Sequence, residues 1–292
     1  MRYQSWAAPD TGLRVNSHFF ETGEGVVVVD TQLHLPFAEE VLQRIRATTS
    51  GDVRYVINTH AHPDHWYGNT VFRAAFPRAG FITARSVAED LRLTALPRRE
   101  RWERLYGDRI PREDELVWPT VVFTGRLTLR LGGLTIHVDE WGPAEANAHT
   151  VVHIEEDRVL LTGDVVDSKK HPWVGERHID DWIAMIEAFP ARYSVDRVLP
   201  GHGQPGRTEL LEESKDWLVN YRRVVERHLD PGATDLTEAG AQRAFEEIVG
   251  KYPDYFLPRW GESTNLAIGL RKLDVSFTIN RGRPIRTPDG KM

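Results

Sequence analysis

Four side chains able to bind metal ions lie within the segment His60-Ala61-His62-Pro63-Asp64-His65. Imidazole and carboxylate groups are common protein ligands of zinc, iron and manganese, and this chain has no cysteine to serve instead. Because His60 and His62 alternate along the chain, they can face one metal ion while Asp64 and His65 face a second. Surface loops also carry such residues by chance, but this density of ligands argues against chance. The segment therefore predicts a site for two metal ions.

Strands must present these side chains. The β-branched run Val53–Ile57 predicts a buried strand directly before the segment, and open α/β sheets place their sites in such strand-end loops. Two further predicted strands end in a metal-binding residue, at Gly163-Asp164 and at Pro200-Gly201-His202-Gly203. A glycine in each relieves the backbone at a sharp turn. Each short motif by itself is weak evidence for a metal site. Because both follow the His60–His65 segment in this order, together they become strong evidence.

These motifs together resemble the metallo-β-lactamase superfamily, in which His-x-His-x-Asp-His is followed by a further ligand, Gly-Asp and Pro-Gly-His-Gly. The resemblance extends from about Gly12 to Gly203, roughly two thirds of the chain. It implies an α/β fold, a four-layer αββα sandwich, with two metal ions at one edge of the sheets and Asp164 bridging them. It also implies that Asp30, at the end of what we expect to be the second strand, supports the ligands from outside.

One ligand position departs from the superfamily pattern. Its members usually carry a Gly-His-Thr-x-Gly turn, whereas this chain has Glu145 and, four residues later, His149. The predicted strand Thr150–Ile154 follows His149 too closely to leave room for that turn. Counting back from Gly163-Asp164 selects Glu145, and alkylsulfatase-like members are similar in having Glu-Ala-x-Ala here. We therefore favour Glu145 as the ligand and keep His149 as the alternative.

The predicted ligands are His60, His62, Asp64, His65, Glu145, Asp164 and His202. We expect two divalent metal ions, with zinc favoured by the four histidines and iron or manganese as alternatives. Such a pair lowers the pKa of a shared water so that hydroxide exists near neutral pH. We expect Asp64 and Asp164 to be catalytic, because they would orient this nucleophile, and Asp64 to pass a proton to the leaving group.

The sequence thus predicts a binuclear metal-dependent hydrolase acting on a lactam, lactone, thioester or sulfate ester. The alternative is an iron-dependent oxidase or dioxygenase of the same fold. Diiron oxidases of that fold have glutamate where this chain has His62, which counts against them. Candidate substrate contacts are Tyr67, Trp66 and His171, although space filling, core packing and a solvated loop are the plainer interpretations of the three.

The amino-acid composition limits the kinds of partner that we expect for this protein. Of 292 residues 40% are hydrophobic, and no run approaches the roughly 18 apolar residues of a membrane helix. The first residues lack the apolar core of a signal peptide, so we predict a cytoplasmic protein with a small-molecule substrate and no membrane partner. The net charge of −6 argues against a nucleic-acid partner.

We expect one catalytic domain over residues 1–229 and an extension over residues 230–292 packed on it. Residues 91–119 predict a helix and a long loop lying over the site. The extension is predicted to be helical over Glu238–Gly250 and irregular afterwards. Its aromatic segment Tyr252–Trp260 is a candidate to pack on the domain, to complete the pocket, or to join two copies in a homo-oligomer.

Overall fold

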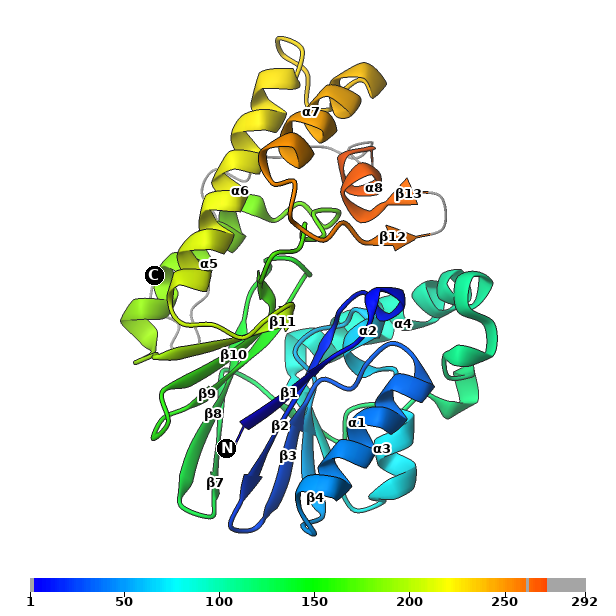
Figure 1. The fold of residues 1–292 in the computed structure, drawn as a ribbon, viewed down its shortest axis with the longest axis vertical. Helices are drawn as coiled ribbons and strands as arrows, with labels where there is room; N and C mark the ends of the chain where they lie inside the picture. Colours follow the sequence, from blue (N-terminus) through cyan, green and yellow to red (C-terminus); the bar gives the residue numbers. More distant parts are fainter. Residues whose placement is uncertain (1–2, 261–262, 272–292) are drawn as a thin grey trace.

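The computed structural model describes residues 3–260 and 263–271. Within these residues two sheets pack face to face (Figure 1). The six-stranded sheet has the order β1 (Tyr3–Ala7), β2 (Asn16–Thr22), β3 (Gly25–Val29), β4 (Val53–Ile57), β5 (Gly80–Ala84) and β6 (Val121–Phe123). The five-stranded sheet has the order β11 (Arg197–His202), β10 (Val159–Asp167), β9 (His149–Ile154), β8 (Leu134–Trp141) and β7 (Arg126–Leu131).

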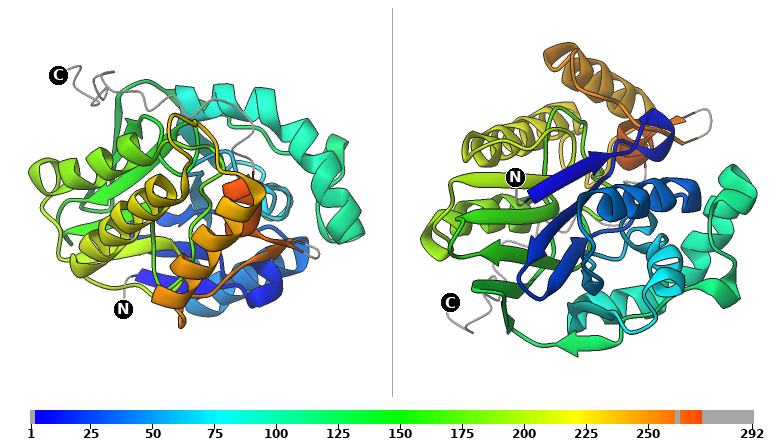
Figure 2. Two further views of the ribbon diagram at one scale, coloured as in Figure 1. Left: turned by 90° about the horizontal axis from the view of Figure 1, so that it is seen from above. Right: turned by 60° about the horizontal axis from the view of Figure 1, so that its bottom comes forward.

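Helices cover the outer face of each sheet (Figures 1 and 2). The first sheet is covered by α1 (Leu35–Thr48) and α3 (Asn69–Ala75), and the second by α5 (Ile179–Arg192) and α6 (Glu209–His228). The expected four-layer αββα sandwich is therefore confirmed. The remaining elements of this body are α2 (Pro63–Trp66), α4 (Arg85–Tyr106) and short 3-10 turns at Asp10–Gly12, Gly107–Arg109 and Glu113–Glu115.

Strand β3 shows why the sequence produces these layers. Val27 and Val29 pack in the core between the two sheets, whereas Val26 and Val28 pack under the helices of the outer layer. A strand covered on both faces needs an apolar residue at every position. The unbroken valine run is therefore the signature of a strand in the middle of a layered sandwich.

Helix α4 runs unbroken through Pro97 from Arg85 to Tyr106, and a loop with two short 3-10 turns follows it up to β6, as the predicted helix and long loop required. One expectation about the elements was wrong. Two strands precede β3, so Asp30 follows the third strand and not the second. Strand β2 escaped prediction because it buries the polar residues Asn16, Ser17 and His18, which conceal its pattern.

The C-terminal extension packs on α6 (Figure 1). It comprises α7 (Glu238–Lys251), the hairpin of β12 (Arg259–Trp260) and β13 (Ser263–Thr264), and α8 (Asn265–Arg271). The hairpin and α8 replace the irregular structure predicted after the first helix. Residues 272–292 of the predicted extension lie outside the described residues. Among the helices that the structure describes, none is long and apolar enough to cross a membrane.

Candidate metal centre

The loop between β4 and α2 carries the central motif and is held rigidly by its neighbours. The side chain of Asn58 donates a hydrogen bond to the carbonyl of His65 at 2.9 Å and accepts one from Asn69 at 2.8 Å. The backbone N–H of Thr31 donates to the same carbonyl at 3.0 Å. Because these groups are buried, the loop backbone is fixed and the directions of its side chains are set.

The first ligand group joins two histidines of this loop to Glu145. Oε2 of Glu145 lies 3.0 Å from His62 Nδ1 and 3.4 Å from His60 Nε2. His149 lies outside this group and supports it: its Nε2 accepts a hydrogen bond at 3.0 Å from the N–H of Ala146. The structure therefore places the favoured residue Glu145 in the cluster and gives His149 the task of holding the turn that carries it.

The second ligand group contains Asp64, His65 and His202. Oδ2 of Asp64 lies 3.4 Å from His202 Nε2 and 3.6 Å from His65 Nε2. Asp164 lies between these histidines, with Oδ1 3.2 Å from His65 and Oδ2 3.1 Å from His202. A Cβ at Gly201 would fall 1.9 Å from Asp164 Oδ1, so only glycine leaves room for this carboxylate. Asp164 is thus the side chain that connects the parts of the cluster.

Three of the four histidines are oriented by a buried partner on the ring nitrogen that faces away from the cluster. These pairs are His60 Nδ1 with Thr59 Oγ1 at 3.0 Å, His65 Nδ1 with Asp30 Oδ2 at 2.8 Å, and His202 Nδ1 with the Leu13 carbonyl at 2.8 Å. Each partner leaves the Nε2 of its histidine directed at the cluster. Asp30 therefore has the supporting position that the sequence predicted.

The cluster fits a pair of cations. Five of its buried atoms have no hydrogen-bond partner among the described residues: His60 Nε2, His65 Nε2, Glu145 Oε2, Asp164 Oδ1 and His202 Nε2. Each unsatisfied buried polar atom costs about 1–3 kcal/mol. Four imidazole nitrogens with three carboxylates form a donor set that suits zinc, and also iron or manganese.

Proximity shifts the pKa values of these groups. Burial opposes the charging of His65 and His202, yet Asp164 beside them holds the pKa of His65 well above its usual value and that of His202 at about 9. Burial raises the pKa of Glu145 to about 7, against the attraction of His62. Protons therefore compete with metal ions for this cluster.

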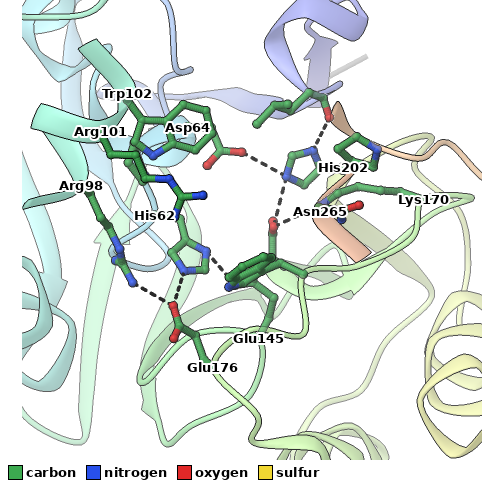
Figure 3. A pocket seen from close by; sticks show the side chains of 15 residues that line it. His62, Asp64, Arg98, Arg101, Trp102, Glu145, Lys170, Glu176, His202 and Asn265 are labelled. Carbon is green, nitrogen blue, oxygen red and sulfur yellow. Dashed lines mark hydrogen bonds and ion pairs between the residues drawn. The ribbon is translucent and has the colours of Figure 1, made fainter. Parts of the chain in front are cut away.

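A pocket opens above the cluster (Figure 3). Its floor consists of cluster residues. Its walls come from α4, from the loop between β10 and α5, and from the extension. The lining side chains are Leu13, His62, Pro63, Asp64, Arg98, Arg101, Trp102, Glu145, Asp164, Lys170, Trp173, Glu176, His202, Pro258 and Asn265.

The three candidate substrate contacts do not line this pocket among the residues that the structure describes. Trp66 and Tyr67 turn into the core between the sheets, where burial raises the pKa of the Tyr67 phenol. His171 is buried against Trp217 of α6 and Tyr255 of the extension. The plainer interpretations of Trp66 and Tyr67 fit their positions, whereas His171 is packed in the interior and does not lie in a solvated loop.

The pocket instead contains residues that sequence reasoning undervalued. Mixed charges on a helix usually indicate an exposed face, yet Arg98, Arg101 and Trp102 of α4 share one face of the helix and line the pocket. That spacing was a usable signal. Lys170, directly before His171, is only 5% exposed, and its Nζ lies 2.9 Å from Asp167 Oδ2. No local pattern pointed to Asn265.

The fold and the site together define an αββα sandwich with a candidate metal centre at the ends of its strands. The family model of the metallo-beta-lactamase superfamily matches residues 10–202. The chain belongs to this superfamily, as its motifs predicted.

Individual relatives differ in their named activities. A metallo-beta-lactamase type 2 of Bacillus sp. (strain 170) is 28% identical over 217 residues, covering 73% of this chain and 74% of that protein. A linear primary-alkylsulfatase of Pseudomonas sp. (strain ATCC 19151) is 25% identical over 255 residues, covering 73% of this chain. That match spans 47% of the alkylsulfatase, so the chain corresponds to about half of it.

Solved structures show the same fold. A metallo-beta-lactamase from Pontibacter korlensis superposes with a TM-score of 0.58 at 23% identity, covering 70% of this chain and 87% of the other. A double mutant of the sec-alkyl sulfatase PisA1 gives a TM-score of 0.62 at 16% identity, covering 89% of this chain and 46% of the other. At these identities the likeness concerns the fold alone.

Proposed function

We propose that this protein is a binuclear metal-dependent hydrolase of a small ester-like or amide-like substrate. The observation that carries the proposal is the convergence of two ligand groups, connected by Asp164, on the floor of a pocket. His60, His62 and Glu145 would hold one metal ion, and Asp64, His65 and His202 the other. Zinc is the favoured ion, with iron or manganese as alternatives.

When bound, the metal ions would supply hydroxide near neutral pH and stabilise the negative charge that develops on the substrate. The side chains of the protein would position the attacking oxygen and supply a proton to the leaving group. Asp164 lies between His65 and His202, where it can fix the attacking oxygen relative to the pocket. Asp64 lines the pocket and contacts His202, so its carboxylate can pass a proton to the leaving group.

The walls of the pocket favour an anionic substrate with an apolar part. Arg101 brings positive charge to the lining, whereas Asp164 and Asp167 offset the charge of Lys170. Trp102 and Trp173 bring aromatic surface. Lactams, lactones, thioesters and sulfate esters all remain within the proposed class. We place sulfate esters first, because Glu145 follows the alkylsulfatase-like pattern and one relative is named an alkylsulfatase. A cytoplasmic location stays a prediction from the sequence.

The test is elemental analysis of the purified protein for zinc, iron and manganese, followed by a substrate panel of the four classes. We expect about two metal ions per chain and turnover of at least one class. Dominant iron with no hydrolysis would favour an oxidase or dioxygenase instead. Absence of bound metal, even after dialysis against each ion, would contradict the proposal.

A further inference from the structure

His62 differs from the other three histidines in how it is held. The side chains of His60, His65 and His202 are at most 1% exposed, so the core encloses them, whereas that of His62 is 12% exposed and projects into the pocket. Its Nδ1 faces Glu145. Surrounding packing therefore does less to fix this ring, and another group must set its orientation.

That group is Glu176, on the loop between β10 and α5. Its Oε1 lies 3.4 Å from His62 Nε2, the nitrogen that faces away from the cluster (Figure 3). The contact joins loops 114 residues apart in the sequence. A metal-bound imidazole commonly donates its second N–H to a carboxylate, which fixes the ring and increases its basicity. Glu176 thus contacts the ring nitrogen of His62 that faces away from the cluster, as Asp30 contacts that of His65.

Arg98 of α4 holds Glu176 in turn. One guanidinium nitrogen donates to Glu176 Oε1 at 3.1 Å, and the other donates to the carbonyl of Ala61 and to Thr94 Oγ1, both at 3.0 Å. Ala61 lies between the two histidines of the first ligand group. Arg98 therefore fixes the backbone of the ligand loop and the carboxylate that contacts His62 with the same planar group.

This arrangement also distinguishes Arg98 from an anion-binding residue. Its guanidinium is directed at a carboxylate, a carbonyl and a hydroxyl of the protein, and Asp90 Oδ2 lies 3.8 Å away. The charge of Glu176 offsets its own. Arg98 lines the pocket, but its hydrogen bonds are made to the protein and favour a structural task at the site.

We propose that Glu176 and Arg98 form a positioning pair that directs Nδ1 of His62 at the first metal ion, together with His60 and Glu145. The inference rests on the proposed metal site. It predicts that the pair controls the affinity of one metal ion of the two, because its hydrogen bonds reach His62 and the backbone of Ala61, and His62 belongs to the first ligand group.

The experiment measures zinc affinity by competition with a chelator, and the visible spectrum of the cobalt-substituted protein, for the parent chain, Glu176→Ala and Glu176→Gln. We expect Glu176→Ala to weaken one of the two binding steps by about 10–100-fold and the other by less than about threefold. Glu176→Gln should retain most of the affinity, since its amide oxygen can still accept from His62 and Arg98. The matched control is Glu155→Ala, because Glu155 contacts His137 at 3.1 Å in another part of the molecule.

Arg98→Ala should weaken the same binding step, and adding it to Glu176→Ala should cost less than the sum of the two single changes. Unchanged affinity of both steps in Glu176→Ala would overturn the proposal. So would an equal loss at both steps accompanied by a lower unfolding temperature of the metal-free protein, since that indicates general damage. If the parent chain itself binds no metal, the proposed function fails as well, so the two failures are distinguishable.

Discussion

The floor and the walls of the pocket are built differently. The floor lies at the ends of strands in the sandwich, and three of its four histidines are oriented by buried groups of the sheets and their loops. The walls come from α4, from the loop between β10 and α5, and from the extension, and ion pairs such as Arg98–Glu176 hold them. The difference teaches that the chemistry is placed on rigid elements and substrate recognition on elements added around them.

The largest expected effect falls on the floor. Asp164→Ala removes the carboxylate between His65 and His202 and should lower activity by more than about a thousandfold, because metal ions supply several kcal/mol of charge stabilisation. Metal content should fall in parallel in elemental analysis. The control is Asp196→Ala, on an exposed aspartate paired with Arg158. Retained activity and metal in Asp164→Ala would contradict the assignment of the floor.

A second change tests which residue completes the first ligand group. Glu145→Ala should leave about one metal ion per chain and lower kcat by roughly a hundredfold, since a ligand of one ion is lost. His149→Gln should keep both ions, because a glutamine oxygen can accept the hydrogen bond of the Ala146 N–H. The opposite result, with metal lost only in the His149 variant, would make His149 the ligand.

A third change tests the wall. Trp102 lines the pocket and stacks on Tyr106 with ring centroids 5.4 Å apart. Trp102→Leu should raise KM by about tenfold for a substrate with an apolar part, because apolar contact area is lost, and leave kcat within about threefold. Steady-state kinetics on the best panel substrate separates the two constants. A fall in kcat with unchanged KM would show that the wall takes part in the chemistry.

The smallest expected effect concerns the attachment of the C-terminal extension, whose Tyr255 packs against His171. Burial lowers the pKa of His171 from 6.5 to about 4, so it stays neutral in the folded protein while the unfolded chain takes up a proton below about pH 6.5. Its stabilising contribution is therefore complete above that pH and declines as the pH falls toward about 4. When the pH is lowered from about 7 to about 5, the unfolding temperature of the His171→Phe variant should fall by about 2–4 °C less than that of the parent. An equal pH dependence in both proteins would contradict this role.

The sequence predicted the floor better than the walls for a physical reason. His60, His62 and His65 lie within one loop directly after a buried strand, so local spacing specifies their placement. Glu145 could be found by counting from Asp164, since Glu145 lies shortly before β9 and Asp164 lies in the neighbouring strand β10. Trp66 and Tyr67 follow the same motif but turn into the core, and a helix as short as α2 offers too few residues to tell which side faces the site.

Long-range contacts set the rest of the pocket. Glu176 reaches His62 only because the two sheets bring their loops together, and Asn265 arrives with the extension. Neither lies in a pattern of its own. The continuity of α4 through Pro97 was equally hidden, because proline in a helix interior usually indicates a break. Such features depend on packing between distant segments, which spacing along the chain does not encode.

Phe256 attaches the extension directly to the site. Its backbone N–H donates to the carbonyl of Lys169 and its carbonyl accepts from His171, both at 2.8 Å, on either side of the pocket residue Lys170. During synthesis from the N-terminus the seven candidate ligands are all present once His202 has been made, whereas the lining of the pocket is completed only with Pro258 and Asn265. A growing chain therefore possesses its complete set of metal ligands before it possesses the part of the pocket wall that the extension contributes.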